Sequence, residues 1–249
     1  MSLRLDWCSH DAAKYSVERW HYSKCMPIGK VVKIGVWEDA KFIGCIMYST
    51  GASAQLHKAF GVSRFEIAEL VRVALNSHKA PVSKILSISI KLLKKTAPNL
   101  KLLVSFADPE HKHYGGIYQA SNWVYVGEST PGVYFKLPDG TITHNRNLMG
   151  PKGFGGSSTK EIQQRYTDWR NKALKEGKIT KITTLPKHKY LYPLTDDMRS
   201  RIEPLRKPYP KRASVVHNVE QPAYQQEEGG SIPTLTHTAT GKEPVRING

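Results

Sequence analysis

The sequence predicts an α/β fold in which a mixed sheet carries helices on both faces. Within residues 1–150, apolar segments with strand character alternate with segments whose apolar residues recur at helical spacing. A chain of 249 residues with 39% hydrophobic content can bury one sizeable core. The apolar run 102–104, bounded by polar residues, is typical of a strand buried on both faces.

A helix is the first predicted element. Ser9 or Asp11 caps it, and it ends near His21 and Tyr22. Its apolar residues fall on one face: Ala13, Val17 and Trp20. Two strands follow, 31–38 and 41–49, and a tight hairpin at residues 38–40 joins them.

The next segments complete the predicted sheet. The apolar segment 68–75 reads as a strand, and the polar loop NSHKAPVS after it leads into an amphipathic helix that Pro98 stops. After the strand at 102, we expect a short helix over 115–122 and strands over 123–127 and 132–137. The predicted order is helix, three strands, helix, strand, helix and two strands.

The net charge of +16 and the pI near 9.7 predict attraction to polyanions, with nucleic acid the first candidate and an anionic membrane the second. Residues 1–150 hold 19 basic and 11 acidic residues, a net of +8. Residues 151–212 hold 16 and 6, a net of +10, and residues 213–249 hold 2 and 4, a net of −2. We therefore expect a folded domain over 1–150, a basic helical and extended extension over 151–206, and a disordered tail over 207–249.

The basic extension begins with the glycine-rich stretch GPKGFGGSS, which is typical of a flexible linker. A helix is predicted between Thr159, as its cap, and Gly177, as its end. Residues 187–192 then interleave cations with aromatics, a mixture that suits phosphate contacts and base stacking. A basic surface strand packed on the main domain by its tyrosines explains the same residues.

No apolar run is long enough to span a bilayer, and the N-terminus lacks a signal-peptide pattern, so we expect a soluble, intracellular protein. The three cysteines, Cys8, Cys25 and Cys45, are odd in number and lack the paired spacing of metal ligands. They predict free thiols in a reducing compartment.

Ionisable residues crowd the carboxyl end of the strand at 102. Asp108 follows that strand, and Glu110, His111, His113 and Tyr114 come directly after it. Ligands bind at the carboxyl ends of strands in open α/β sheets, because loops and helix ends supply polar groups there. The other interpretation of Asp108 and Pro109 is a turn that ends the strand.

The element order resembles the Gcn5-related N-acetyltransferase fold. Three motifs inside it are similar to the Mom family of phage DNA-modification proteins: HYSK at 21–24, ELVRVAL at 69–75, and SFAD with GGIYQASNWVYVG within 105–127. The resemblance implies conversion of adenine in double-stranded DNA to N6-(carbamoylmethyl)adenine, which hides phage DNA from restriction enzymes. It also implies a catalytic domain over 1–150 and a location in the cytoplasm of an infected bacterium.

By position, the resemblance implies functional roles for His21, Tyr22, Arg72, Asp108 and Tyr118. In Mom proteins the first two and the aspartate are proposed to hold a metal, with iron as the candidate; the spacing here is not diagnostic. The structural alternatives are a helix C-terminus for His21 and Tyr22, and helix packing on the sheet for Tyr118. For Arg72 the alternative is a surface cation, whereas a buried arginine needs a carboxylate or phosphate partner.

The resemblance further implies acetyl-CoA or a related acyl donor. Acetyltransferases usually hold its pyrophosphate on a glycine-rich turn, but the corresponding loop, 76–84, contains no glycine. The predicted donor-binding residues are Leu75, Lys79, Ser83, Lys84 and Tyr118. A helix N-terminus and two lysines remain compatible with a phosphate.

N6 of adenine is a poor nucleophile, so the reaction needs a base, for which Asp108 or Glu110 is the candidate. The adenine must also leave the duplex, and the predicted stacking residues for it are Trp123, Tyr114 or Tyr118. Two other functions fit the sequence. One is an acetyl-CoA-dependent N-acetyltransferase that acts on a protein or small amine, and the other is a non-catalytic DNA-binding protein on the same scaffold.

Overall fold

The computed structural model describes residues 2–27, 29–51, 55–148 and 160–211. The strands are β1 (Leu3–Trp7), β2 (Val31–Glu38), β3 (Lys41–Ser49), β4 (Ile67–Leu75), β5 (Leu102–Ala107), β6 (Val124–Glu128), β7 (Val133–Lys136), β8 (Ile142–His144), β9 (Thr180–Thr183) and β10 (His188–Pro193). The α-helices are α1 (His10–Trp20), α2 (Val82–Thr96), α3 (Gly116–Gln119), α4 (Lys160–Lys175) and α5 (Asp196–Ile202). Short 3₁₀ turns lie at Leu56–Phe60, Pro109–His111, Asn145–Leu148 and Glu203–Leu205.

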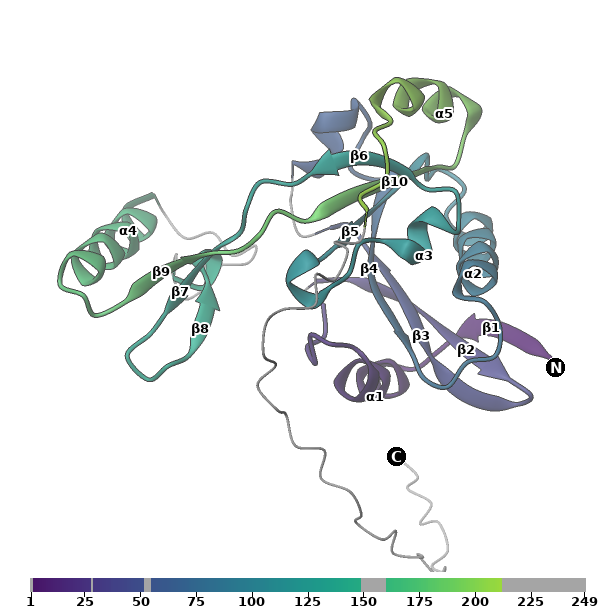
Figure 1. Ribbon diagram of the computed structural model, residues 1–249, viewed down its shortest axis with the longest axis horizontal. Helices are drawn as coiled ribbons and strands as arrows, with labels where there is room; N and C mark the ends of the chain where they lie inside the picture. Colours follow the sequence, from purple (N-terminus) through teal and green to yellow (C-terminus); the bar gives the residue numbers. More distant parts are fainter. Residues whose placement is uncertain (1, 28, 52–54, 149–159, 212–249) are drawn as a thin grey trace, which may run out of the picture. The chain divides into compact units, whose positions relative to one another are not determined.

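Within the described residues, seven strands form one sheet in the order β1-β2-β3-β4-β5-β10-β6 (Figure 1). Its neighbouring strands are antiparallel except β4 and β5, which are parallel. The predicted mixed sheet is therefore confirmed. The edge strand β1, which precedes the first predicted helix, was not expected from the sequence.

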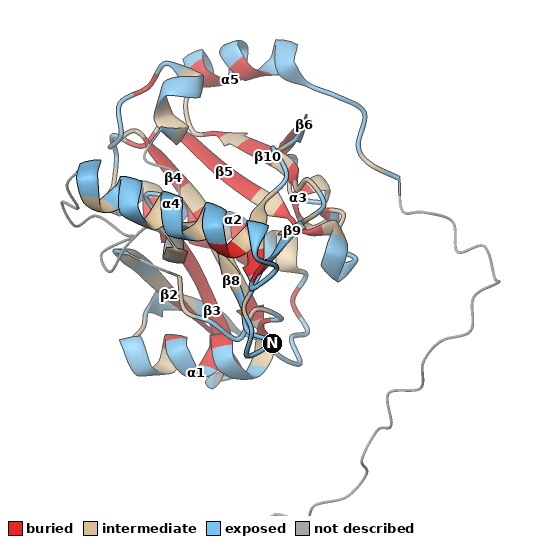
Figure 2. Cartoon of the chain, turned by 90° about the vertical axis from the view of Figure 1, so that its left-hand side faces the viewer, coloured by how far each residue is buried: buried red, intermediate tan, exposed pale blue. Residues whose placement is uncertain are grey.

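Helices cover both faces of this sheet, as predicted (Figure 1). Alternate residues of β3 point to opposite faces. Cys45 and Met47 pack with Ala13 and Val17 of α1. Ile46 packs instead with the apolar stripe of α2, whose buried members are Ile85, Leu86, Ile90 and Leu93. The buried residues therefore concentrate on the central strands, whereas the outer faces of α1, α2 and α4 are exposed (Figure 2).

Strand β10 comes from the predicted basic extension, yet it is a central strand. It pairs with β5 from His188↔Ala107 to Pro193↔Leu102, and its other edge pairs with β6. Tyr190 and Leu191 are fully buried. The segment is therefore a strand packed on the main domain through Tyr190, as the alternative expected, but it lies inside the sheet and not at its surface, and Tyr190 is too buried to stack on a base. The predicted boundary at residue 150 does not coincide with an end of the sheet. Met1–Arg212 form one compact unit.

The first residues of the predicted tail also pack on the sheet. Lys207 N donates to Tyr125 O (2.8 Å), and Tyr209 Oη donates to Trp123 O (2.7 Å). The remainder of that predicted tail, 212–249, and the predicted linker, 150–158, with the predicted cap Thr159, lie outside the described residues.

Strands β7, β8 and β9 form a second sheet in the order β8-β7-β9. We call these strands and α4 the arm. Its small core contains Phe135, Ala173 and Ile179. In sequence the arm lies between β6 and β10, two neighbours in the large sheet. No helix among the described residues is long and apolar enough to cross a membrane.

A β-bulge in β4 controls which side chains face which helix. Met47 pairs with Arg72, but the next residue of β3, Tyr48, pairs with Leu70, so Val71 is an extra residue. An extra residue reverses the alternation of a strand. Leu70 packs in the α2 core, whereas Ala74, four residues later, packs in the α1 core. The bulge thus directs Arg72 to the α1 face.

Candidate functional site

A cleft of about 400 Å³ opens where β4 and β5 separate. The two parallel strands pair only from Ile67↔Leu102 to Glu69↔Val104. Beyond that point, residues 70–73 of β4 and 106–107 of β5 line the cleft. The lining includes each residue for which the resemblance implied a catalytic role: His21, Tyr22, Arg72, Asp108 and Tyr118. Four segments distant in sequence bring them together.

Asp108 lies at the carboxyl end of β5, as predicted, and is 6% exposed. One oxygen, Oδ1, accepts from Glu110 N (3.1 Å) and so caps the turn that follows. The other, Oδ2, lies 2.8 Å from Lys187 Nζ. Burial is the largest single influence on the pKa of Lys187 and lowers it, but the hydrogen bond to Asp108 and the charge of that carboxylate, with smaller effects of Tyr22 and Tyr134, together raise the pKa. The predicted turn is therefore confirmed, Asp108 lines the cleft, and sequence reasoning missed Lys187 as its partner.

His21 follows the last residue of α1 and is buried. Its Nδ1 accepts a hydrogen bond from Ser23 N (3.1 Å) and lies 2.8 Å from Ser23 Oγ. Burial, with the nearby charge of Arg72, lowers the pKa of His21 to about 4. The ring is therefore neutral near pH 7, and because Nδ1 is an acceptor, Nε2 carries the proton.

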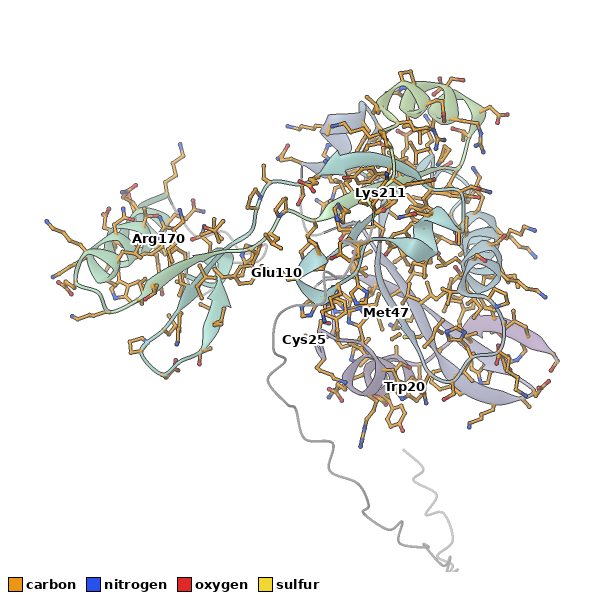
Figure 3. The ribbon with its side chains drawn as sticks, in the orientation of Figure 1. Trp20, Cys25, Met47, Glu110, Arg170 and Lys211 are labelled. Carbon is orange, nitrogen blue, oxygen red and sulfur yellow. The ribbon has the colours of Figure 1, made fainter. Side chains whose placement is uncertain are left out.

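Arg72 holds the loop after α1 against β4. Its Nε and Nη2 both donate to Cys25 O (3.2 and 3.0 Å), and its Nη1 donates to Val71 O (2.7 Å). These partners are backbone carbonyls and not the expected carboxylate or phosphate. Cys25 is labelled in Figure 3, on the segment that this guanidinium holds. All three cysteines are free, as predicted.

Tyr118 is a buried residue of α3, in keeping with the packing alternative, yet it also lines the cleft. Its hydroxyl lies 2.7 Å from Ser105 Oγ, which lies 2.8 Å from Leu70 O. A carbonyl can only accept, so the single serine proton goes to Leu70 and the phenol donates to Ser105. Burial raises the pKa of Tyr118 to about 12, which keeps it protonated.

The predicted metal ligands, His21, Tyr22 and Asp108, do not fit a metal site. A neutral histidine ligates through a free nitrogen lone pair, but Nδ1 of His21 already accepts from Ser23 N. The ammonium group of Lys187 lies 2.8 Å from Asp108 Oδ2, and its positive charge opposes a metal cation at the same carboxylate. No group of three or more His, Cys, Asp or Glu side chains in the described part of the chain is placed to hold a metal ion.

Of the predicted donor-binding residues, Leu75 and Tyr118 line the cleft, and Lys79, Ser83 and Lys84 are not among its lining residues. The backbone N–H groups of Lys79 and Ala80 donate to Glu38 Oε2 and Oε1 (2.8 and 2.7 Å). These two bonds lower the pKa of Glu38 and keep it anionic. A carboxylate of the protein thus occupies two backbone amides of the loop 76–84, which the sequence places where acetyltransferases have their pyrophosphate-binding turn.

The aromatic residues predicted to stack a base differ in accessibility. Trp123 is fully buried and Tyr118 is 7% exposed, so neither presents a ring face to a base. Tyr114 is half-buried beside His188, with 5.9 Å between ring centroids. Trp123 and Tyr118 are therefore core residues, and the choice of these two as stacking residues was wrong.

The comparisons with known proteins agree with the motifs. The Mom protein family model matches residues 2–211. The chain belongs to the Mom protein family. Among curated proteins, it is 24% identical over 196 residues to the methylcarbamoylase Mom of Escherichia phage Mu, covering 72% of this chain and 80% of that protein.

Solved structures similar to this Mom family member are of aminoglycoside acetyltransferases. The structure of AAC(6')-Ib in complex with coenzyme A and kanamycin matches with a TM-score of 0.38 and 13% identity, over 66% of this chain and 98% of that one. The structure of the N-acetyltransferase AAC(6')-Ib11 matches with a TM-score of 0.39 and 13% identity, over 58% and 95%.

Proposed function

We propose that this chain is a phage DNA-modification enzyme that converts adenine in duplex DNA to N6-(carbamoylmethyl)adenine. Membership of the Mom family supports adenine modification as the activity. The single observation that carries the proposal is the cleft between β4 and β5, which gathers His21, Tyr22, Arg72, Asp108 and Tyr118. The resemblance of the element order to the Gcn5-related N-acetyltransferase fold implies an acyl donor such as acetyl-CoA, which would supply an activated two-carbon unit when bound. Acetyl transfer alone would give N6-acetyladenine and free coenzyme A, so the carbamoylmethyl product also requires a source of the amide nitrogen and a bond from N6 to the methylene carbon.

Asp108 is the candidate proton acceptor. The lone pair of adenine N6 is delocalised into the ring, so bond formation at N6 requires removal of one of its protons. Asp108 lines the cleft, and the ion pair with Lys187 holds the carboxylate in place. Glu110, the alternative base, accepts from Leu185 N (3.0 Å) and is absent from the residues that line the cleft. We therefore assign proton removal to Asp108.

His21, Arg72 and Tyr118 have supporting roles in this proposal. The proton on Nε2 makes neutral His21 a hydrogen-bond donor, suited to an oxygen or ring nitrogen of the substrate. Arg72 keeps His21 and its loop in place through Cys25. Tyr118 remains protonated and donates its proton to Ser105, so its phenol oxygen is left to accept a hydrogen bond from a polar group at the base of the cleft.

The arm supports duplex DNA as the substrate. Its exposed cations on and after α4 are Lys160, Arg165, Lys172, Lys175, Lys178 and Lys181. Such cations neutralise phosphates without reading sequence. The connector from β9 to β10 joins the arm to the cleft, because Leu185 N donates to Glu110 and Lys187 pairs with Asp108. Glu110 is labelled beside this connector in Figure 3.

Nucleoside mass spectrometry tests the proposal. Plasmid DNA from cells that express the chain is digested to nucleosides, and we expect an adenosine heavier by one carbamoylmethyl group. DNA from cells that express Asp108→Asn is the control and is expected to lack it. Unmodified adenosine in the presence of folded protein would refute the proposal, and an N-acetylated protein or amine in its place would support the ordinary acetyltransferase.

A further inference from the structure

An array of aromatic rings from two separate loops lies at the cleft. Its members are His21, Tyr22, His111 and His113. The Tyr22 ring centroid lies 4.3 Å from that of His21, 4.2 Å from that of His111 and 5.1 Å from that of His113. The rings are tilted by 30° to 41° to one another. Contacts this close join the loop after α1 to the loop after β5.

The array is buried at one end and open at the other. His21 is 8% exposed and Tyr22 is 42% exposed, and His111 and His113 are also exposed. Tyr22 and His113 line the cleft. Aromatic rings that are already packed against one another have little side-chain entropy left to lose when a ligand stacks on them.

The array lies near Asp108, the candidate proton acceptor. The charges of Lys187 and Asp108 act on the phenol of Tyr22, although burial is the largest cause of its raised pKa. A flat ligand on this surface therefore lies near the carboxylate. Burial also lowers the pKa of His113, so its ring is uncharged near pH 7 and stacks without attracting a phosphate into the cleft.

We propose that His111, His113 and the exposed part of Tyr22 form the subsite that receives the extruded adenine base by stacking. This inference rests on the proposed function, because it names the residues that hold the substrate there. A purine removed from the duplex loses its stacking neighbours, and an aromatic surface replaces them. The array supplies the surface that the buried Trp123 and Tyr118 do not.

Binding measurements separate base stacking from backbone contacts. One set of duplexes carries a single adenine opposite an abasic site, and the matched set is abasic at both positions. The wild type is expected to bind the first set about 5- to 140-fold more tightly, the range that stacking of one base on aromatic residues gives. The double variant His111→Ala, His113→Ala is expected to bring this ratio close to one.

Controls make the result specific. Tyr22→Phe keeps the ring and should keep the ratio, whereas Tyr22→Ala should reduce it. His10→Ala, an exposed histidine at the start of α1 and outside the cleft, should leave it unchanged. The subsite is overturned if the wild-type ratio is one or if the double histidine variant keeps the wild-type ratio. Mass spectrometry of wild-type-treated DNA decides the proposed function separately: unmodified adenosine with the ratio retained refutes that function and leaves the subsite in place.

Discussion

Replacing Lys187 with methionine should destabilise the protein through the carboxylate that it leaves behind. Methionine keeps the apolar stem but removes the ammonium group that lies 2.8 Å from Asp108 Oδ2. The side chain of Asp108 is only 7% exposed, so water replaces the lost partner poorly. Lys189→Met, two residues further along β10, is the matched control.

The size of the effect follows from the exposure of the two groups. Removing one partner of a buried ion pair costs about 3–5 kcal/mol. The Lys187 side chain is 37% exposed, and solvent screening weakens such a pair, so we expect about 1–2 kcal/mol. In a folded unit of this size that loss lowers Tm by roughly 2–8 °C.

Urea unfolding of a double-mutant cycle measures this interaction. Asp108→Asn keeps an acceptor for Glu110 N and should cost about 1 kcal/mol by itself. In the double variant, Lys187→Met should cost little more, which gives a coupling energy of about 1–2 kcal/mol. A coupling energy below about 0.3 kcal/mol would show that the two charges are independent in solution and would refute the reasoning. Asp108→Asn should also abolish adenine modification while duplex affinity stays within about twofold.

Three further predictions concern the histidine, the tyrosine and the arm. Folding lowers the pKa of His21 to about 4, so neutral His21 contributes its whole share of stability above the unfolded pKa of about 6.5. That contribution is lost as the pH falls towards 4. The urea midpoint of His21→Asn should therefore change less over this pH range than that of the wild type. Tyr22→Phe should retain adenine modification and unchanged metal content by elemental analysis; a joint loss of iron and activity would reinstate the metal role. Arg165→Gln and Lys172→Gln should each reduce the slope of log affinity against log salt by up to about 0.9, and Lys91→Gln on α2 should not; equal slopes would exclude these cations from the DNA interface.

The local pattern of the sequence was sufficient for much of the fold. The mixed sheet follows from apolar periodicity, and the position of Asp108 follows from the end of the buried run at 102–107, because both signals lie within one segment. The motifs also indicated His21, Arg72 and Tyr118, which the fold brings together in one cleft. Each of these predictions needed only neighbouring residues or a motif.

Contacts between distant segments were decided by the tertiary structure. Tyr190 and Leu191 lie among charged residues in the sequence, so the pattern did not indicate a core strand. They are buried because β10 pairs between β5 and β6 in the sheet. The bulge at Val71 turns Arg72 to the opposite face from the one that simple alternation predicts. Lys187 reaches Asp108 from 79 positions away, and Glu38 reaches the amides of Lys79 and Ala80 across 41 and 42 positions. Periodicity carries no information about such pairs, because each depends on how whole elements pack. The sequence by itself therefore determined the class of fold and the candidate residues, and the packing determined the partners of those residues.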